Sequence, residues 1–326
     1  MAKTHAIRFE ATGGPDKLKW VELELGAPGP GEVLLRNSAI GLNFIDTYHR
    51  SGLYPVPLPS GIGLEAAATV EALGPGVGDF KVGDRVAHGT GPLGAYAERR
   101  IFPVDRLVKL PDAIDDKRAA AMMLQGMTVE YLVRRTFPVK RGQTVLFHAA
   151  AGGVGLIACQ WLNSIGATVI GTVGSPEKAK IAEAHGCHYV IDYRRENFTA
   201  RVREITKGAG VPVVYDGVGK DTFAGSLDCL ARRGMMVSFG NASGPVPPIE
   251  PGILNAKGSI FLTRPSLMHY VATREELLDS ANALFEMVLK GAVKIEVHQT
   301  YPLKDAARAH TDLEARRTTG STILLP

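Results

Sequence analysis

Small residues at a fixed spacing in the middle of the chain point to the binding of a nucleotide. The segment 144–173 reads TVLFHAAAGGVGLIACQWLNSIGATVIGTV, which has the pattern of a strand, a tight turn, a helix and a second strand. Ala150, Gly152 and Gly155 fall at the three small-residue positions of a dinucleotide-binding turn, A-x-G-x-x-G. In such a turn the first N–H groups of the helix face the pyrophosphate. We therefore predict a dinucleotide site here, with an ordinary glycine-rich turn as the alternative.

The end of the second strand predicts which dinucleotide binds. Folds that bind NAD usually carry Asp or Glu about 20 residues after the glycines, where the carboxylate binds the ribose diol. Residues 173–178 instead read VGSPEK. Gly174 leaves room for a 2′-phosphate, Ser175 or the proline after it can start the next helix, and Lys178 can supply a positive charge. We expect NADP(H) to bind, although Lys178 alone would also fit a solvated lysine in a first helical turn.

Composition excludes several classes of protein. The chain has 326 residues, of which 45% are hydrophobic, so it is long enough for two domains with separate cores. Its formal net charge of +4 is small, and no long run of Lys or Arg marks a nucleic-acid surface. The three cysteines lack C-x-x-C spacing, which indicates buried thiols and a reducing compartment. Because no apolar leader and no apolar span of about 18 residues occurs, we expect a soluble cytoplasmic protein.

Short β-type runs dominate the first 110 residues. Turns rich in glycine and proline, such as PGPG at 28–31, separate these runs, and this pattern predicts a partly closed antiparallel barrel. A helical turn is expected at 43–50. The β-type runs cover residues 18–23, 32–40, 66–73, 84–87 and 95–101.

Strands and helices alternate after Pro111, which is typical of a parallel sheet with crossover helices. Six strands are expected, the number in a doubly wound sheet, at 144–148, 168–173, 187–191, 211–215, 235–240 and 259–263. Helices are expected at 115–123, 128–136, 154–162, 176–184, 198–206 and 223–230. We expect the tail to return to the barrel and complete it, with helices at 273–290 and 303–314 and strands at 295–301 and 321–325.

Seven short segments carry a resemblance to a known family. They are GLNFIDTY at 41–48, RSGLY at 50–54, GLEA at 63–66, GDRV at 83–86, the glycine turn at 149–155, SFGN at 238–241 and TRPS at 263–266. Over essentially its whole length the chain resembles the zinc-free quinone oxidoreductases of the medium-chain dehydrogenase/reductase superfamily, the group that includes zeta-crystallin. The resemblance is strongest to the bacterial NADPH:quinone reductases.

The resemblance implies an α/β fold in which a Rossmann domain, with its doubly wound parallel sheet, is inserted into a GroES-like, mainly β barrel domain. Residues 1–125 are then the first part of the GroES-like catalytic domain, residues 126–265 the NADPH-binding Rossmann domain, and residues 266–326 the return to the catalytic domain. The resemblance also implies a cofactor cleft between the domains and a homodimer paired through the Rossmann sheets.

The resemblance further implies the residues that bind NADPH. In such proteins the 2′-phosphate is held by the S-x-x-K stretch and by a tyrosine after the third strand, here Ser175, Lys178 and Tyr193. Gly217 is a departure, because relatives often carry serine there. Beside these four residues and the turn glycines Gly152 and Gly174, the expected cofactor site includes Asn43, Phe44, Ile45, Asp46, Thr47, Tyr48, Tyr131, Gly153, Val154, Phe239, Gly240, Asn241, Ala242, Pro265, Ser266, Leu267 and Arg316.

The expected substrate site has no zinc ligands. Alcohol dehydrogenases of the same superfamily hold a catalytic zinc ion with two Cys and one His, and zinc catalysis needs three such ligands and an open position. Here Asn43 stands at the first Cys position and Leu64 at the His position, and no Cys precedes Cys159. We therefore predict chemistry without a metal.

A quinone suits such a site because its ring is already a strong hydride acceptor. The protein then has to hold the nicotinamide against the ring and exclude water. Tyr48 and Tyr54 can stack on a flat ring or donate a hydrogen bond to its oxygen, Asn43 can also donate one, and Asp46 can anchor the loop. None of these four candidate catalytic residues is assigned as an acid or base, and packing is the alternative role for both tyrosines and for Tyr131.

We accordingly predict an NADPH-dependent quinone reductase that works by hydride or single-electron transfer. Two alternatives stay open: a reductase of enone or alkenal double bonds, and a protein that binds NADPH for structural or RNA-binding purposes. The weak and dispersed positive charge disfavours RNA. The expected partners are a small quinone and a second copy of the chain, with neither nucleic acid nor a membrane.

Overall fold

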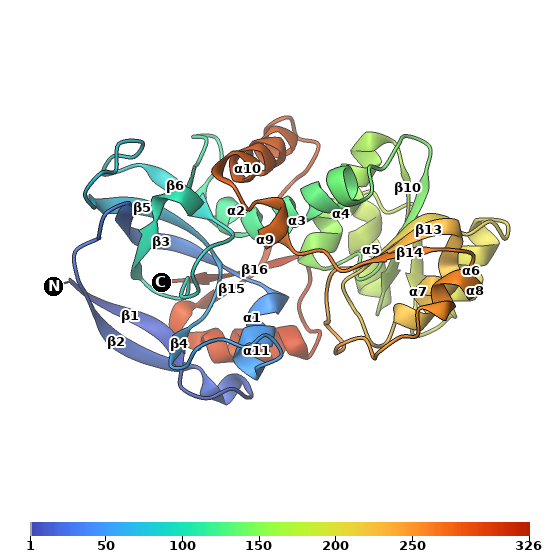
Figure 1. Ribbon diagram of the computed structural model, residues 1–326, viewed down its shortest axis with the longest axis horizontal. Helices are drawn as coiled ribbons and strands as arrows, with labels where there is room; N and C mark the ends of the chain where they lie inside the picture. Colours follow the sequence, from blue (N-terminus) through green and yellow to red (C-terminus); the bar gives the residue numbers. More distant parts are fainter. Residues whose placement is uncertain (1) are drawn as a thin grey trace. The chain divides into compact units, whose positions relative to one another are not determined.

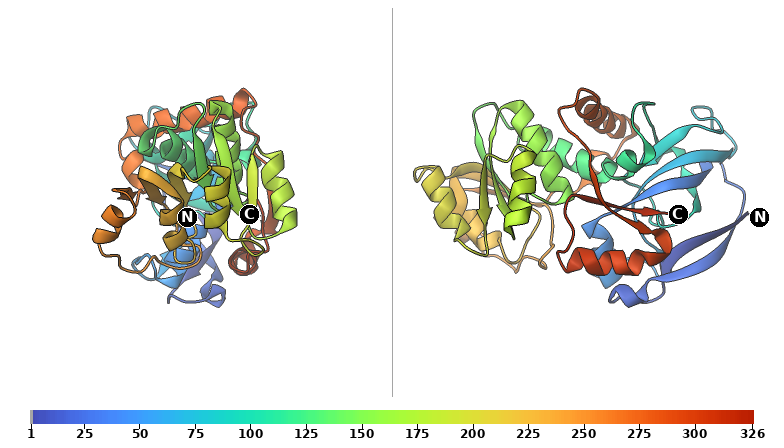
Figure 2. Two further views of the ribbon diagram at one scale, coloured as in Figure 1. Left: turned by 90° about the vertical axis from the view of Figure 1, so that its right-hand side faces the viewer. Right: turned by 180° about the vertical axis from the view of Figure 1, so that it is seen from behind.

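The chain folds into two compact units. The computed structural model describes residues 2–326. The first unit contains Met1–Met127, Val271–Leu289 and Ile295–Pro326, and the second contains Thr128–Tyr270 and Lys290–Lys294. Both ends of the chain therefore belong to the first unit, as the blue and red segments of Figures 1 and 2 show.

A seven-stranded sheet forms the body of the first unit. Its strands run in the order β15-β16-β3-β5-β6-β8, and β7 also pairs with β3. The tail strand β16 thus lies between β15 and β3, which confirms that the tail returns to this sheet. The strands are β3 (Glu32–Leu42), β5 (Glu65–Leu73), β6 (Arg85–His88), β7 (Arg99–Pro103), β8 (Val108–Lys109), β15 (Val297–Pro302) and β16 (Ser321–Leu325).

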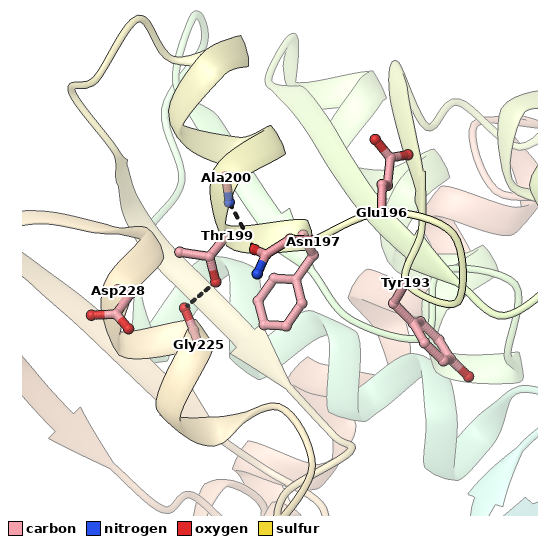
Figure 3. A pocket seen from close by; sticks show the side chains of 8 residues that line it. Tyr193, Glu196, Asn197, Thr199, Ala200, Gly225 and Asp228 are labelled. Carbon is pink, nitrogen blue, oxygen red and sulfur yellow. Dashed lines mark hydrogen bonds between the residues drawn. The ribbon is translucent and has the colours of Figure 1, made fainter.

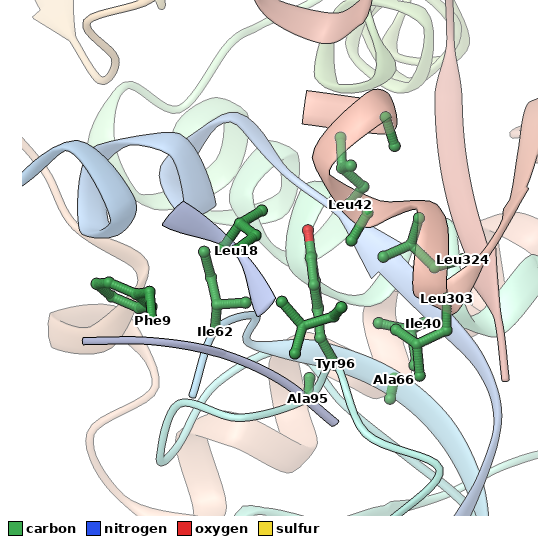
Figure 4. Close-up of a cluster of buried hydrophobic side chains, with 13 residues drawn as sticks. Phe9, Leu18, Ile40, Leu42, Ile62, Ala66, Ala95, Tyr96, Leu303 and Leu324 are labelled. Carbon is green, nitrogen blue, oxygen red and sulfur yellow. The ribbon is translucent and has the colours of Figure 1, made fainter. Parts of the chain in front are cut away.

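Two apolar clusters among the described residues contribute to the core of the first unit. Alternate residues of a strand face opposite sides, so Val33 and Leu35 of β3 point together into a cluster with Phe102 of β7. The other cluster, drawn in Figure 4, includes apolar residues of β3 and β16 and surrounds the ring of Tyr96. A three-stranded sheet in the order β2-β1-β4 contributes to that cluster through β1. Its strands are β1 (Ala2–Phe9), β2 (Lys19–Leu25) and β4 (Ser60–Gly61).

A long helix in the tail of the first unit buries one apolar face. In α10 (Arg274–Leu289) the buried residues Leu277, Ala281 and Leu284 recur every three or four positions, which is the spacing of one helix face. The other helical elements are α1 (Phe44–Ser51), α2 (Asp116–Ala120), α11 (Ala306–Glu314) and the short turns η1 (Pro15–Lys17), η2 (Val104–Arg106) and η4 (Leu303–Asp305). Helix α3 (Met123–Tyr131) contains the boundary between the units.

The second unit is built on a parallel sheet of six strands in the order β11-β10-β9-β12-β13-β14. This order is that of a doubly wound nucleotide-binding sheet, so the predicted fold class is confirmed. The carboxyl ends of β9 and β12 lie where the order reverses, which is where ligands bind in such sheets. The strands are β9 (Thr144–Phe147), β10 (Thr168–Val173), β11 (Tyr189–Asp192), β12 (Val211–Asp216), β13 (Leu230–Ser238) and β14 (Phe261–Thr263).

Crossover helices connect these strands. Each follows a strand in the chain, as the alternating sequence pattern predicts. They include α4 (Gly153–Ile165), α5 (Pro176–Ala184), α6 (Phe198–Ile205), α7 (Phe223–Cys229) and the shorter α8 (Gly252–Ala256). The π-helical turn η3 (Leu132–Thr136) precedes β9, and α9 (Leu267–Tyr270) follows β14.

Two elements differ from the sequence prediction for reasons that lie in distant side chains. The strand expected at 95–101 begins only at Arg99, because the amide of Asn37 binds the carbonyl oxygens of Ala95 and Ala97 and holds this segment as a loop. The helix expected at 115–123 stops at Ala120, and α3 starts three residues later. A carboxylate from β5, described below, accepts hydrogen bonds from the first N–H groups of α3 and sets this new start.

The packing of α10 gives a direct test of the tail's return. Leu284 is fully buried and Leu289, in the same helix, is 53% exposed. Replacing Leu284 by alanine should cost about 2–5 kcal/mol because it leaves a cavity in the first unit. Leu289→Ala should cost less than about 0.5 kcal/mol. Melting temperatures of the two variants measure the difference, and equal losses would show that α10 does not pack through this face.

Candidate functional site

The glycine turn of the second unit is shaped by a close contact between helix α4 and the backbone of the turn. Helix α4 begins after Gly152, and its third residue is Gly155. A Cβ atom on Gly155 would lie 2.3 Å from the carbonyl oxygen of Ala149, so a larger residue does not fit. The glycine therefore lets the helix approach the backbone of the turn itself, just beyond the end of β9, and it leaves the first N–H groups of α4 directed out of the turn.

A buried carboxylate joins the loops at the carboxyl edge of this sheet. Asp216, at the end of β12, accepts the N–H groups of residues 218 and 219 at 2.8 and 3.0 Å and the hydroxyl of Ser226 at 2.9 Å. Ser226 in turn accepts from His148 Nε2 at 2.9 Å, because its own proton is directed to Asp216. Thr172 then donates to His148 Nδ1 at 2.9 Å. Burial lowers the pKa of His148, so the ring is neutral and fixed in one tautomer.

The expected 2′-phosphate residues come together at the end of β10. Ser175 caps α5 by accepting the N–H of Lys178 at 3.3 Å. A Cβ atom on Gly174 would lie 2.5 Å from the hydroxyl oxygen of Tyr193, so the missing side chain is what admits this tyrosine. Tyr193 is 38% exposed. The hydroxyl of Tyr193 and the start of α5 therefore lie at the end of β10, and Lys178 belongs to the first turn of that helix.

A surface pocket of about 630 Å³ lies beside this position (Figure 3). Of the expected site residues, only Tyr193 lines it. Asn197 caps the start of α6 there, and Thr199 donates to the carbonyl oxygen of Gly225. The lining residues are Tyr193, Glu196, Asn197, Phe198, Thr199, Ala200, Gly225 and Asp228. Most of the pocket is therefore distinct from the expected cofactor residues.

The other expected residues of the second unit lie in loops or first helical turns that follow the strands, except for Tyr131. Residues 239–242 lie against Gly217, since the N–H of Ala242 donates to the Gly217 oxygen at 3.2 Å. Gly153 and Val154 form the first turn of α4, and residues 265–267 follow β14. Tyr131 lies apart from these loops in α3: it is 2% exposed and stacks on Tyr270, with ring centroids 4.3 Å apart. Its position supports the packing role.

In the first unit, Asn43 is surrounded by its own hydrogen-bond partners. It precedes α1, and its backbone N–H donates to Asp46 Oδ2 at 2.9 Å. Its side-chain Nδ2 donates to Glu65 Oε2 at 2.6 Å, and its Oδ1 accepts from Gln125 Nε2 at 3.1 Å. Both ends of the amide are thus used within the unit. This geometry favours a structural role for the Asn43 side chain over donation to a substrate.

Glu65 is the residue of this site that the sequence reasoning left without a role. It is fully buried, and its Oε1 accepts the N–H of Leu124 in the first turn of α3 at 2.9 Å. Burial raises the pKa of Glu65 to about 8 and that of Asp46 to about 7. The sequence contains one indication of a role for Glu65. It is a single glutamate in the mostly apolar run GLEAAATV, where an unpaired charge would be costly.

Aromatic side chains gather around α1. The ring of Tyr48 lies 5.8 Å from that of Phe44 and 5.1 Å from that of Tyr54, the latter edge-on. The structure therefore brings both predicted substrate tyrosines together. Arg316 lies elsewhere in this unit, exposed just after α11, with a left-handed φ of 59°.

The zinc positions of related dehydrogenases hold other side chains here. Leu64 is buried and apolar, and the amide of Asn43 is already bonded to Glu65. Among residues 2–326, no group of three or more His, Cys, Asp or Glu side chains is arranged to hold a metal ion. Nor does any described helix combine the length and the apolar character needed to cross a membrane.

The fold and these two sets of residues define a medium-chain dehydrogenase/reductase. Residues 29–112 match the family model "Alcohol dehydrogenase GroES-like domain", and residues 153–286 match the model "Zinc-binding dehydrogenase". The second description does not fit Leu64 and Asn43, which cannot replace His and Cys as zinc ligands.

Comparison with full-length relatives identifies the family within this superfamily. It is 57% identical to a quinone oxidoreductase of Pseudomonas aeruginosa over 98% of this chain and 99% of that one. The structure of an Escherichia coli quinone oxidoreductase complexed with NADPH matches with a TM-score of 0.97 and 52% identity, over the whole of both chains. A 2-haloacrylate reductase from Burkholderia is 50% identical over 96% of each chain. The chain belongs to the quinone oxidoreductase family, as its sequence motifs predicted.

Buried carboxyls in the first unit predict a fall in stability at alkaline pH. Glu65 and Asp46 have ordinary pKa values of 4.5 and 3.8, and the folded values are about 8 and about 7. Their stabilising contribution is therefore complete below about pH 4 and is lost as pH rises through the folded pKa values. His88 and His310 do not add to this fall between pH 7 and 9, because burial lowers their pKa values to about 3.

We expect the melting temperature to fall from pH 7 to pH 9, and to fall less in Glu65→Gln, which has no proton to lose. Calorimetry at several pH values measures both slopes. A variant that loses stability as steeply as the wild type would contradict the assignment of this fall to Glu65.

Proposed function

We propose that this protein reduces quinones with NADPH. The observation that carries this proposal is the full-length likeness to a quinone oxidoreductase complexed with NADPH, with a TM-score of 0.97. The chain is an oxidoreductase of this family, and NADPH is its cofactor. When bound, NADPH supplies a hydride, and the residues of this chain bind and orient both reactants and exclude water.

The second unit supports NADPH over NADH. We propose that Ser175, Lys178 and Tyr193 bind the 2′-phosphate, which is supported by the Ser175 cap, by the Tyr193 hydroxyl beside Gly174 and by the absence of a carboxylate at the end of β10, where NAD-binding folds carry one. We propose that Gly152 to Val154, Gly174, Gly217, residues 239–242 and 265–267, and Arg316 bind the remainder of the cofactor, together with residues 43–48. Tyr131 has the weakest claim because its ring is stacked on Tyr270.

For the substrate, we propose that Tyr48 and Tyr54 contact the acceptor ring and that Asp46 and Asn43 hold the segment that carries Tyr48. A site without zinc ligands suits a quinone, because gaining a hydride converts its ring to an aromatic product. The second candidate function is the reduction of an activated carbon–carbon double bond. The observation in its favour is the 50% identity to a 2-haloacrylate reductase.

Four further properties belong to this proposal. We propose that the functional domains are 1–125 and 266–326 for catalysis and 126–265 for the cofactor, and that the protein is a cytoplasmic homodimer. The small net charge of +4 supports the absence of a nucleic-acid partner. The cysteines support a reducing compartment, since all three are buried and free.

Cofactor choice tests the phosphate site. Lys178→Ala should weaken NADPH binding by about 1.5–3 kcal/mol, the range for a hydrogen bond to a charged group, and leave NADH binding nearly unchanged. Fluorescence titration with each cofactor measures both. Lys180→Ala is the matched control, an exposed lysine in the same helix. Equal losses for NADPH and NADH would refute the assignment of Lys178 to the phosphate.

Acceptor choice tests the reaction. NADPH oxidation should be faster with 1,4-benzoquinone or a naphthoquinone than with a 2-alkenal or 2-chloroacrylate. A rate with the alkenes alone would replace the proposed function by the second candidate. No rate with any acceptor, despite NADPH binding, would favour a structural role.

A further inference from the structure

A buried arginine ties α1 to the tail helix α11. Arg50, in the last turn of α1, is 2% exposed. Its two terminal nitrogens donate to both carboxylate oxygens of Glu314 at 3.0 and 2.7 Å, and Nη1 also donates to His310 Nδ1 at 3.0 Å. Glu314 and His310 both belong to α11. Glu314 therefore balances the charge of Arg50, and His310 lies between α1 and the core.

The hydrogen bonds continue from His310 to the start of α1. His310 Nε2 lies 3.2 Å from the hydroxyl oxygen of Tyr96, and that hydroxyl donates to Asp46 Oδ2 at 2.8 Å. Asp46 also accepts the backbone N–H of Asn43. The side chains of Asp46, Tyr96 and His310 are all fully buried. This network of hydrogen bonds thus runs from Glu314 at the surface to Asn43, the residue before α1.

The chemistry of Arg50 determines which atom donates and which accepts in the hydrogen bonds from Arg50 to Asp46. An arginine can only donate, so His310 Nδ1 accepts and the ring is neutral with its proton on Nε2. The Tyr96 oxygen then accepts from His310, and its own proton is directed to Asp46. Burial lowers the pKa of His310, in agreement with a neutral ring. Asp46 Oδ2 accepts both of these hydrogen bonds, and Oδ1 is buried without a hydrogen-bond partner among the described residues.

Helical geometry connects this network to the aromatic residues. At 100° per residue, Asp46 and Arg50 share one face of α1, while Phe44 and Tyr48 lie about 200° away on another. The network binds the first face at both ends of the helix. The rotation of α1, and with it the direction of Tyr48, is therefore set from the opposite side.

We propose that Tyr96, His310 and Arg50 are positioning residues for the acceptor substrate, which they serve by keeping the Asp46 carboxylate in the arrangement that fixes α1 and Tyr48. The inference rests on the proposed function, because it takes Tyr48 as a residue that contacts the acceptor. The charged or titratable groups that face Asp46 are Tyr96 from the segment before β7 and Glu65 from β5, with His310 and Arg50 behind Tyr96.

Tyr96→Phe removes the hydroxyl and retains the ring in the apolar cluster. The KM for the acceptor should rise about tenfold, while the dissociation constant for NADPH, measured by fluorescence without turnover, should rise less than about threefold, because most of the proposed cofactor residues lie in the second unit. The Tyr96 hydrogen bond lowers the pKa of Asp46. Its loss should therefore move the acidic limb of kcat/KM for the acceptor upward by about one pH unit. A purely structural role would leave that limb in place.

Tyr301→Phe is the matched control. Tyr301, in β15, donates to Asp312 Oδ2 of α11 at 2.9 Å, so this variant also loses one tyrosine–aspartate hydrogen bond, but on α11 and outside the network. Its KM and pH profile should equal those of the wild type. Equal changes in the two variants, or no change in Tyr96→Phe, would overturn the proposal.

Glu314→Gln keeps the test open if Tyr96→Phe fails to fold, because it alters only the partly exposed end of the network. Its KM for the acceptor should rise about threefold with a smaller change in NADPH binding, and an unchanged KM would overturn the proposal. The same measurements apply to a 2-alkenal if the wild type reduces only alkenes, so a wrong acceptor is told apart from a wrong network. A wild type that reduces no acceptor would overturn both proposals.

Discussion

Carboxyl groups buried without a basic side chain are the constraint around which the first unit is arranged. Asp46 receives the N–H of Asn43 and the Tyr96 hydroxyl, and Glu65 receives the Asn43 amide and an N–H at the start of α3. Each carboxyl would be costly in an apolar core without such donors. Asn43 serves both, so α1, α3 and β5 must keep one relative arrangement for the donors to reach.

The second unit also contains a buried carboxyl group that is stabilised by hydrogen-bond donors, and this group lies at the edge of its sheet. Asp216 is fully buried, and backbone N–H groups and hydroxyls surround it. Through Ser226 and His148 it connects the end of β12 to the ends of β9 and β10. These are the strands whose following loops carry the expected nucleotide residues. A buried polar network thus holds the ends of these three strands together.

Local patterns in the sequence were sufficient for much of this structure, and long-range contacts explain what they missed. The glycine turn, the Ser175 cap and the strand at 168–173 depend on neighbours in the chain, so their spacing predicts them. Glu65, Tyr96 and His310 appear as isolated polar residues whose partners lie up to 260 residues away. No periodic pattern in the sequence predicts contacts between residues so far apart. The early end of the helix expected at 115–123 has the same cause, because its successor starts at a carboxylate from β5.

The place of β16 inside the seven-stranded sheet has a consequence for how the chain folds during synthesis. The second unit is almost continuous, so most of its contacts are available once residue 270 has left the ribosome. The first unit has to wait, since β16, with neighbours on both sides, is made of residues 321–325. Until then the edge of β3 that pairs with β16 is unprotected, and exposed edges promote aggregation. The nascent chain therefore carries most of the second unit before β3 gains β16 as a neighbour.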